Sequence, residues 1–212
     1  MKVWILAGGR LVATPELMRL RAVPPALVVA ADGGIEHAQM LQVTPHLWVG
    51  DFDSSLPTDP RFTHIPRQPV ARDKDFTDTE LALHVARERG ASEVTVWGAF
   101  GGRFDHTLAL ALLSVRTSQA GLAVRLHSGD ESARPLLPGP PCTLATYPGQ
   151  LLSVLALDDL RGLRIQGVRW PLAGVDVPAG SGWTVSNEAA GNTALLSVGV
   201  GRALIVQRWP HA

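Results

Sequence analysis

The sequence predicts an α/β protein, in which an N-terminal domain with a Rossmann-like, mostly parallel sheet precedes a C-terminal antiparallel β-sandwich domain. In the first half, short apolar runs alternate with segments of helical periodicity, which is the pattern of parallel strands joined by helices. After about Leu126, short apolar runs separated by turn residues follow one another, which favours a sandwich. We therefore expect domains at residues 1–128 and 129–212.

The elements of the first half follow each other in the order strand, loop, helix. Two helix starts are marked, one by Thr14 followed by Pro15, the other by the capping-box spacing of Thr77 and Glu80. The expected strands are Val3–Leu6, Ala26–Ala31, Leu47–Val49, Phe62–Ile65 and Val94–Trp97, and Ala123–His127 fits either domain's sheet. The expected helices are Glu16–Arg21, Ile35–Leu41, one from Thr77 that ends before Gly90, and Thr107 to about Val115. This order predicts helices on both faces of the sheet.

The second half contains only short strands. Pro and Gly are dense between Pro135 and Pro148, and turn residues separate the apolar runs that follow. The expected strands are Leu151–Leu157, Leu163–Val168, Trp183–Ser186, Leu195–Val200 and Ala203–Gln207. Trp183 is interpreted as a core residue of the sandwich, because half-buried strands favour aromatic side chains.

The composition is typical of a packed globular protein, with 46% hydrophobic and 18% charged residues. Nineteen basic residues balance nineteen acidic ones without a run of Lys or Arg, so we expect no nucleic-acid or anionic-membrane partner. No apolar stretch reaches the roughly 20 residues that a membrane span needs. Cys142 is the only cysteine, which excludes an intrachain disulfide and favours the reducing cytoplasm.

Four polar clusters fall at the ends of strands in the first half, which is where open α/β sheets bind their ligands. They are Asp32-Gly33-Gly34, Asp51-Phe52-Asp53-Ser54, Asp73-Lys74-Asp75-Phe76-Thr77-Asp78, and the glycine-rich loop that ends in Arg103-Phe104-Asp105-His106. Their shared position predicts a single ligand site.

The second cluster has the character of a metal site. In extended backbone, Asp51 and Asp53 point to the same side and lie roughly 6.5 Å apart along the strand. Magnesium prefers oxygen ligands of this kind and completes its shell with water and substrate phosphates. The alternative is that both are turn-forming aspartates at the exit of a strand.

The third cluster combines carboxylates with a cation at a helix start. Asp75 and Thr77 are ordinary capping residues, and Asp78 complements the helix dipole, so a purely structural explanation is available for them. Lys74 is unfavourable before a helix N-terminus unless an anion binds there, and a phosphate would partner both Lys74 and the N–H groups of the first turn. Taken alone, the cluster supports a phosphate site and a purely structural role about equally.

The fourth cluster carries three glycines over Gly98–Gly102, which lets backbone approach a phosphate or a nucleobase closely. It lacks the ending of a P-loop and the spacing of a dinucleotide fingerprint. Arg103 offers a fork of donors for phosphate oxygens, and Asp105 is either a metal ligand or an N-cap. His106 is interpreted as a local hydrogen-bonding residue rather than a catalyst.

In order and spacing, these four clusters closely resemble the motifs of the thiamine pyrophosphokinase family. The resemblance continues through Gly162-Leu163, Gly167–Leu172 and Ser186-Asn187-Glu188, so it covers most of the chain. Some relatives carry an aromatic residue shortly after the last segment, whereas Glu188-Ala189-Ala190-Gly191 has none. Stacking on the substrate would then need Trp183 or another ring.

The resemblance implies an ATP:thiamine diphosphotransferase, with Mg²⁺ as cofactor and AMP as the second product. It also implies a catalytic α/β domain, a sandwich domain that contributes the thiamine site, and a homodimer with active sites in clefts between subunits. The catalytic residues would be Asp51, Asp53, Asp78 and Asp105, with magnesium on Asp51, Asp53 and Asp78. The ATP-binding residues would be Asp32, Gly33, Lys74, Asp75, Thr77, Gly102 and Arg103, and the thiamine-binding residues would be Ser186 and Asn187.

This inventory suits phosphoryl-transfer chemistry, which depends mainly on positioning and charge neutralisation. Either Asp78 or Asp53 is the expected proton acceptor for the attacking hydroxyl. Three rival functions stay open at this stage. A diphosphokinase for a hydroxymethyl pterin would use the same apparatus, and a sensor of thiamine diphosphate or nucleotide would bind without turnover. An Asp-x-Asp glycosyltransferase would need a sugar nucleotide and leaves the later motifs without a role.

Overall fold

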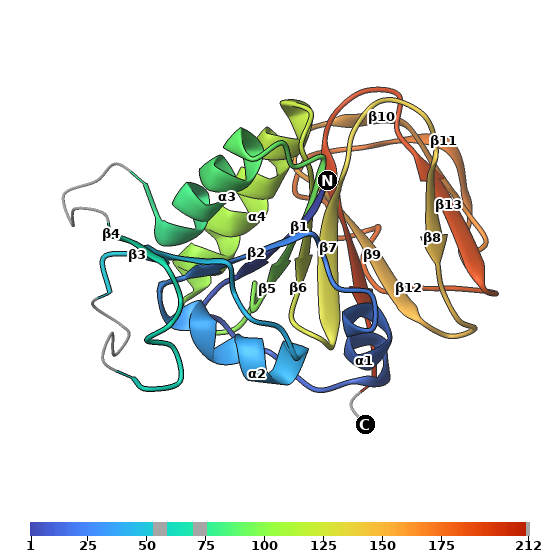
Figure 1. The fold of residues 1–212 in the computed structure, drawn as a ribbon. Coiled ribbons are helices and arrows are strands. Elements are labelled where there is room, and N and C mark those ends of the chain that lie inside the picture. Colours follow the sequence, from blue (N-terminus) through green and yellow to red (C-terminus); the bar gives the residue numbers. More distant parts are fainter. Residues whose placement is uncertain (53–58, 70–75, 211–212) are drawn as a thin grey trace. The chain divides into compact units, whose positions relative to one another are not determined.

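The computed structural model describes residues 1–52, 59–69 and 76–210 (Figure 1). The chain forms two compact units, one of Met1–Asp130 with Pro210 and one of Glu131–Trp209. We call them the α/β unit and the sandwich unit. Together they confirm the predicted fold class.

The α/β unit is built on six parallel strands in the order β6-β5-β1-β2-β3-β4. In chain order the strands are β1 (Lys2–Leu6), β2 (Leu27–Ala31), β3 (Leu47–Gly50), β4 (Arg67–Pro69), β5 (Glu93–Trp97) and β6 (Ala123–His127). All residues of β2 and β3 are buried, as expected for parallel strands that are covered on both faces. Residues 123–127, which the sequence left open between two sheets, pair in parallel with β5.

Helices lie on both faces of this sheet. They are α1 (Pro15–Arg21), the 3₁₀ helix η1 (Asp32–Glu36), α2 (His37–Leu41), α3 (Asp78–Glu88) and α4 (Phe104–Gln119). In Figure 1, α3 and α4 lie on one side of the strands and α1 and α2 on the other. Both predicted helix starts are confirmed, because Thr14 Oγ1 accepts from Leu17 N at 3.1 Å and Thr77 Oγ1 accepts from Glu80 N at 3.2 Å.

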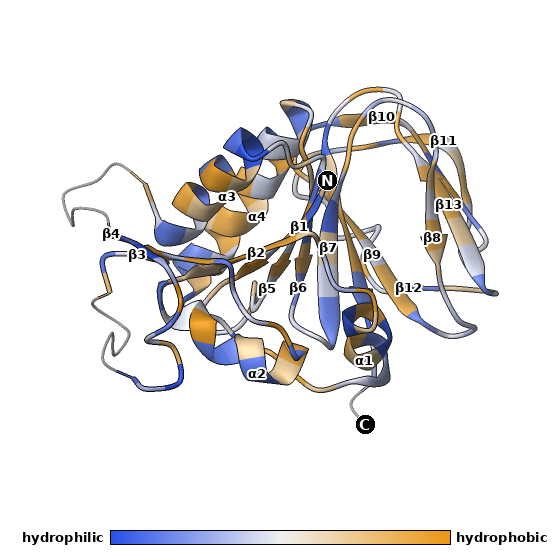
Figure 2. Ribbon diagram, viewed as in Figure 1, coloured by the Kyte–Doolittle hydropathy of each residue, from blue (hydrophilic) through white to orange (hydrophobic). Residues whose placement is uncertain are grey.

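The core beneath α1 and α2 is rich in tryptophan. Trp4, Trp48 and Trp97 are buried in one cluster with Leu17 and Ile35. The rings of Trp4 and Trp97 meet edge to face, with centroids 5.4 Å apart. Figure 2 shows the apolar character of the strands that carry these rings. This core therefore joins the sheet to α1, η1 and α2.

Two first-half predictions need correction. Phe62–Ile65 is not a strand but a turn segment, in which Ile65 N donates to Phe62 O at 3.0 Å. Phe62 and Ile65 are buried although they lie in a turn, which gives this segment the same apolar pattern as a strand. The strand itself follows as β4. Helix α4 also starts three residues earlier than Thr107, with Arg103 and not Asp105 at the N-cap position.

The sandwich unit consists of two antiparallel sheets, with strand orders β12-β9-β14-β7 and β11-β10-β13-β8. The strands are β7 (Glu131–Leu136), β8 (Cys142–Ala145), β9 (Leu151–Ala156), β10 (Leu160–Gln166), β11 (Leu172–Val177), β12 (Asn187–Glu188), β13 (Thr193–Ser197) and β14 (Ala203–Arg208). Leu152 and Ile205 from one sheet share a core with Leu163 and Leu196 from the other. Two layers packed through one core are the defining feature of a sandwich.

Two sequence predictions for this unit are wrong. Residues 183–186 form turns rather than a strand, and the side chain of Trp183 is 60% exposed, so it is not a core residue. Strands β7, β8 and β11 were not predicted, because Pro135 interrupts the first and the other two carry few large apolar residues.

Among the residues described, no helix is both long and apolar enough to cross a membrane.

Candidate active site

The loops that leave the parallel strands meet at one edge of the α/β unit. Ala7 N, just after β1, donates to Trp97 O at 2.8 Å, and Gly9 N donates to Gly98 O at 2.9 Å. On the other side, His37 Nε2 donates to Gly9 O at 2.8 Å, and burial lowers the pKa of this histidine. A neutral His37 thus helps to fix the loop after β1 beside the glycine-rich loop after β5.

The structure brings two of the predicted clusters into contact. A Cβ atom added to Gly50, at the end of β3, would lie 3.3 Å from Cα of Asp32. Asp32 is 9% exposed and has a φ of +41°, a left-handed conformation that is rare outside glycine. Asp51 follows Gly50 directly, so the acidic loops after β2 and β3 lie against each other.

Phe52 sets the turn of the second cluster. It also has a positive φ, +60°, and its ring packs edge to face on Trp48 with centroids 5.0 Å apart. This inward ring anchors the residue that directly follows Asp51. Left-handed non-glycine residues persist only where their surroundings enforce them, and they concentrate at functional sites. Asp53 lies outside the described residues, so only Asp51 of the predicted pair is described.

The third cluster is described from Phe76 onward, and Lys74 and Asp75 lie outside the described part of the chain. Thr77 serves as the N-cap of α3 and Asp78 is its first residue. Glu80 pairs with Arg116 of α4, so this carboxylate holds the two helices together. Because α3 begins at Asp78, the positive end of its dipole lies there, which is favourable for a carboxylate or a bound anion.

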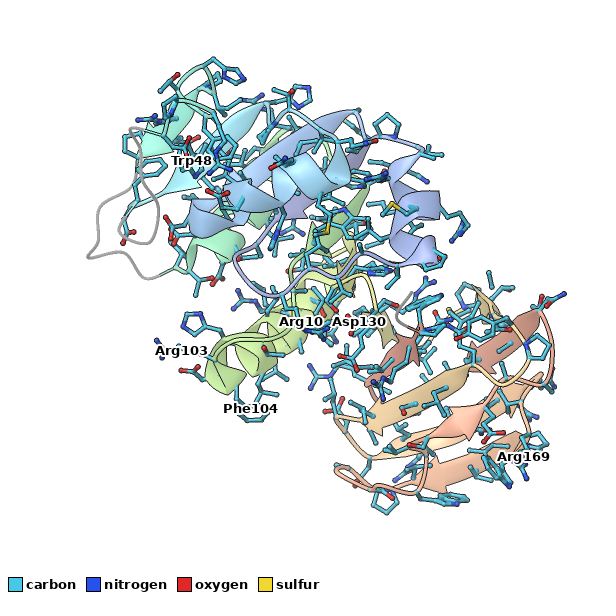
Figure 3. All side chains as sticks on the ribbon, turned by 90° about the horizontal axis from the view of Figure 1, so that it is seen from below. Arg10, Trp48, Arg103, Phe104, Asp130 and Arg169 are labelled. Atoms are coloured by element: carbon cyan, nitrogen blue, oxygen red, sulfur yellow. The ribbon has the colours of Figure 1, made fainter. Side chains whose placement is uncertain are left out.

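The predicted phosphate ligand Arg103 is paired within its own motif. Its Nε donates to Asp105 Oδ1 at 3.1 Å and its Nη2 to Asp105 Oδ2 at 2.5 Å. These hydrogen bonds lower the pKa of Asp105 and raise the pKa of Arg103. Both side chains are exposed, and Figure 3 shows Arg103 at the start of α4. A phosphate at Arg103 would have to compete with Asp105 for the guanidinium.

The sequence did not single out Arg10, which lies against the glycine-rich loop. Arg10 N donates to Phe100 O at 2.6 Å, and a Cβ added to Gly101 would lie only 2.7 Å from Cβ of Arg10. Its Nη1 donates to Asp130 Oδ2 at 2.5 Å, and Ser128 Oγ donates to the other oxygen of Asp130 at 2.9 Å. Figure 3 shows Arg10 and Asp130 directed at each other. The only sequence signal was their position after β1 and β6.

In the sandwich unit, the predicted thiamine residues Ser186 and Asn187 differ in exposure. Ser186 is exposed, has a φ of +61° and donates from its N to Ser153 Oγ at 3.0 Å. Asn187 is buried: its Nδ2 donates to Trp170 O at 2.8 Å, and its Oδ1 accepts from Trp170 N at 3.2 Å. Asn187 therefore clamps the backbone of Trp170.

This clamp presents aromatic surface that sequence reasoning did not place. Trp170 is 51% exposed, and the guanidinium of Arg169 lies 4.8 Å from its ring centroid. Arg169 in turn pairs with Glu188 at 3.0 Å. The exposed ring of Trp183 lies in the turn just before Ser186. Two exposed indoles are thus associated with the Ser186-Asn187 segment. Trp183 lies shortly before it in sequence, and the backbone of Trp170 is hydrogen-bonded to Asn187.

The described carboxylates do not form a complete metal centre by themselves. Within residues 1–52, 59–69 and 76–210, no three His, Cys, Asp or Glu side chains are grouped closely enough to hold a metal ion. The oxygen donors that are described, Asp51 and Asp78 among them, still have the chemistry that magnesium prefers.

Comparison with known proteins agrees with this geometry. Residues 24–126 match the family described as "Thiamin pyrophosphokinase, catalytic domain". Over 207 residues, the chain is 25% identical to the thiamine pyrophosphokinase of Bacillus subtilis, with 96% of each chain covered. The crystal structure of the Bacillus subtilis protein is similar with a TM-score of 0.85 at 23% identity, covering 99% of this chain and 100% of the other.

A thiamin pyrophosphokinase family protein from Enterococcus faecalis is also similar, with a TM-score of 0.83 at 26% identity and the same coverage of 99% and 100%. The matches in sequence and structure run over nearly the full length of both chains. The acidic strand-end loops and the glycine-rich loop lie at one edge of the sheet, and the chain is similar to thiamine pyrophosphokinases in sequence and in fold over nearly its full length.

Proposed function

We propose that this chain is a thiamine pyrophosphokinase that transfers the diphosphoryl group of Mg·ATP to the hydroxyl of thiamine and releases AMP. The observation that carries the proposal is the contact between Gly50 and Asp32, which brings the loops of Asp32 and Asp51 together at the carboxyl edge of the sheet. Open α/β sheets bind nucleotides at this edge. Similarity to thiamine pyrophosphokinases over nearly the full chain supports the choice of reaction.

In the proposed site, carboxylates of the α/β unit would hold the magnesium ion of Mg·ATP. Asp51, Asp53 and Asp78 would hold the ion, which supplies charge neutralisation for the triphosphate. Lys74 and Arg103 would neutralise phosphate oxygens. The positive end of α3 adds to this field, because Thr77 and Asp78 start the helix. The remaining proposed ATP contacts are Asp32, Gly33, Asp75, Thr77 and Gly102.

The ion pair of Arg103 and Asp105 is proposed to exchange partners when phosphate binds. Without nucleotide, Asp105 holds the guanidinium in place at the start of α4. A triphosphate would recruit the guanidinium and free the Asp105 carboxylate for its proposed catalytic role. Because both groups are exposed, this exchange costs little desolvation.

The proposed reaction needs no covalent enzyme intermediate. The thiamine hydroxyl oxygen forms a bond to the β-phosphorus, and the bond from that phosphorus to the oxygen bridging the α-phosphorus breaks. AMP leaves with the bridging oxygen, and the hydroxyl proton passes to a carboxylate, for which we propose Asp78 or Asp53. The work of the protein is to position the two reactants and to balance charge.

We further propose that residues 1–128 bind Mg·ATP and that residues 129–212 bind thiamine through Ser186, with Asn187 acting through its clamp on Trp170. Exposed Trp183 and Trp170 are candidates to stack on the cationic substrate, because aromatic faces attract cations. A reducing cytoplasmic setting suits the single free cysteine, Cys142.

We propose a homodimer, in which sandwich residues of one subunit complete the site of the other. The apolar strands between Leu195 and Val206 are poor candidates for the contact surface, since Leu196, Ala203 and Ile205 face the sandwich core. A better candidate is α4, where Phe104, Leu108 and Leu112 are exposed at a spacing of four residues. Such a stripe on one helix face suits burial against a second copy.

Acceptor competition tests the choice of substrate. Thiamine at saturating concentration should suppress diphosphoryl transfer to a hydroxymethyl pterin completely, and the pterin should leave thiamine turnover unchanged. Preference for the pterin would replace thiamine as the acceptor while keeping the magnesium and ATP apparatus.

A further inference from the structure

We infer that Trp48 is a positioning residue of the nucleotide site, which holds the Asp32 loop and the Asp51 loop in one fixed arrangement. The inference deepens the proposed function, on which it rests. Trp48 lies in β3, two residues before Gly50, and its side chain is completely buried. Because it is buried, Trp48 acts on the nucleotide site through its neighbours and not by contact with ATP or thiamine.

Trp48 is hydrogen-bonded to the first acidic loop. Its indole Nε1 donates to the backbone oxygen of Asp32 at 2.9 Å. Asp32 has the left-handed φ of +41°, and it starts η1 without a side-chain cap. A buried carbonyl needs a donor, and a left-handed residue needs its surroundings to enforce it. The indole supplies the donor at the residue where the backbone is unusual.

The same indole supports the second acidic loop. The ring of Phe52 packs edge to face against Trp48 at 5.0 Å, and Phe52 has the second unusual φ, +60°. Asp51 lies between this anchored residue and Gly50, which itself contacts Asp32. One side chain therefore constrains both loops, and a change in either contact would shift one carboxylate relative to the other.

Trp48 is itself held on its remaining sides. Phe62 packs edge to face at 6.1 Å, and the guanidinium of Arg67 from β4 lies 5.1 Å from the indole centroid. The backbone N of Trp48 donates to Pro66 O at 2.9 Å. A side chain fixed in this way can transmit a fixed position to Asp32 and Phe52, because close-packed interiors have little freedom to rearrange.

Trp97 shows that burial alone does not explain the hydrogen bond. It ends β5 at the same edge of the sheet and is equally buried, yet its Nε1 has no hydrogen-bond partner among the described residues. A purely packing role for an indole is thus present in β5 of the same sheet, without a described bond to a ligand-binding loop. Trp48→Phe removes the N–H that reaches Asp32, whereas Trp97→Phe removes an N–H that reaches nothing described.

The test measures binding of a non-hydrolysable ATP analogue with Mg²⁺ by calorimetry, to the wild type, Trp48→Phe and Trp97→Phe. We expect Trp48→Phe to weaken binding by on the order of 10-fold to 100-fold, since small misplacements of site groups have effects of this size. We also expect the Mg²⁺ concentration that half-saturates binding to rise. Trp97→Phe should bind within about twofold of the wild type, because it alters packing alone.

Thermal unfolding of each variant separates positioning from stability. If Trp48→Phe does not fold, Phe52→Leu takes its place, since it keeps an apolar side chain in the pocket and removes only the ring contact. Binding by the Trp48 variant equal to that of the wild type, or equal losses in both tryptophan variants, overturns the inference. Thiamine turnover is assayed separately, so tight binding of Mg·nucleotide without thiamine turnover would contradict the proposed function and leave this inference standing. Absence of Mg·nucleotide binding by the wild type would overturn both.

Discussion

Arg10 and Asp130, separated by 120 residues in sequence, meet in a hydrogen-bonded ion pair in which Nη1 lies 2.5 Å from Oδ2. The Asp130 side chain is only 5% exposed, whereas that of Arg10 is 39% exposed. Burial alone would raise the pKa of Asp130, but the hydrogen bonds from Arg10 and Ser128 outweigh burial and leave it lowered. The pair closes the α/β unit by tying the loop after β1 to the end of β6.

We expect Asp130→Asn to destabilise the protein by about 1–3 kcal/mol, the usual cost of leaving a buried polar partner unsatisfied. Chemical denaturation measures this free energy of unfolding. The matched control is Glu93→Gln, which breaks the exposed pair of Lys2 and Glu93 and should cost less than about 1 kcal/mol. Equal effects of the two substitutions would show that the buried pair has no special weight.

His127 makes stability depend on pH. It is buried beside Trp97, and its Nδ1 accepts from Gly129 N at 2.9 Å, so that nitrogen carries no proton. Burial and, secondly, the charge of Arg125 lower its pKa to about 3. Because the unfolded chain binds a proton near pH 6.5 and the folded chain does not, stability is full above that pH and is lost as pH falls towards 3.

We therefore expect the free energy of unfolding to fall by up to about 1.4 kcal/mol per pH unit below pH 6.5. His37, whose pKa burial also lowers, contributes in the same direction. The slope should decrease clearly in His127→Gln, measured by urea denaturation between pH 4 and pH 7. A slope that is the same in wild type and variant would contradict a neutral, buried His127.

Asp51→Asn and Asp78→Asn should each lower the catalytic rate by on the order of 10² or more, because preorganised charge at a phosphoryl centre is usually a large contribution. Steady-state kinetics and thermal unfolding together measure this. Asp176→Asn is the control, since Asp176 accepts from Gly162 N in the sandwich unit. A near-normal rate in Asp51→Asn would make it a turn residue only, and in Asp78→Asn a helix-start residue only.

Lys74→Ala should raise the Michaelis constant for ATP, and an unchanged constant would argue against phosphate contact.

Subunit complementation tests the proposed dimer. Asp51→Asn disables the proposed ATP half and Trp183→Ala the proposed thiamine half, while Asn187 is left intact because its loss would release Trp170. Random exchange between the two inactive variants should restore about a quarter of wild-type activity, since half of the dimers then hold one intact site. No recovery after proven exchange would place both halves in one chain, and an active monomer would refute the arrangement.

The sequence predicted those features that depend on neighbouring residues. Thr14 and Thr77 cap helices through bonds three residues away, so the signal and the structure are both local. Phe62 and Ile65 misled because burial from a turn gives the same apolar pattern as a strand. Trp183 misled because its strand did not form, which left its ring exposed.

The features that were missed depend on contacts distant in sequence. Arg10 and Asp130 have no local signal beyond lying after strands, and only the parallel sheet brings them together. The contact of Asn187 was missed for the same reason, since its amide binds the backbone of Trp170, 17 residues away. Motif position predicted where ligands bind, whereas the contacts show which side chains hold the backbone in place.

Nucleotide product analysis tests the central claim most directly. The wild-type protein is incubated with Mg²⁺ and ATP, with and without thiamine, and the nucleotides and thiamine esters are separated and quantified. We expect thiamine diphosphate and AMP in equal amounts, and AMP formation only when thiamine is present. Formation of ADP, or nucleotide turnover that does not depend on thiamine, would contradict it.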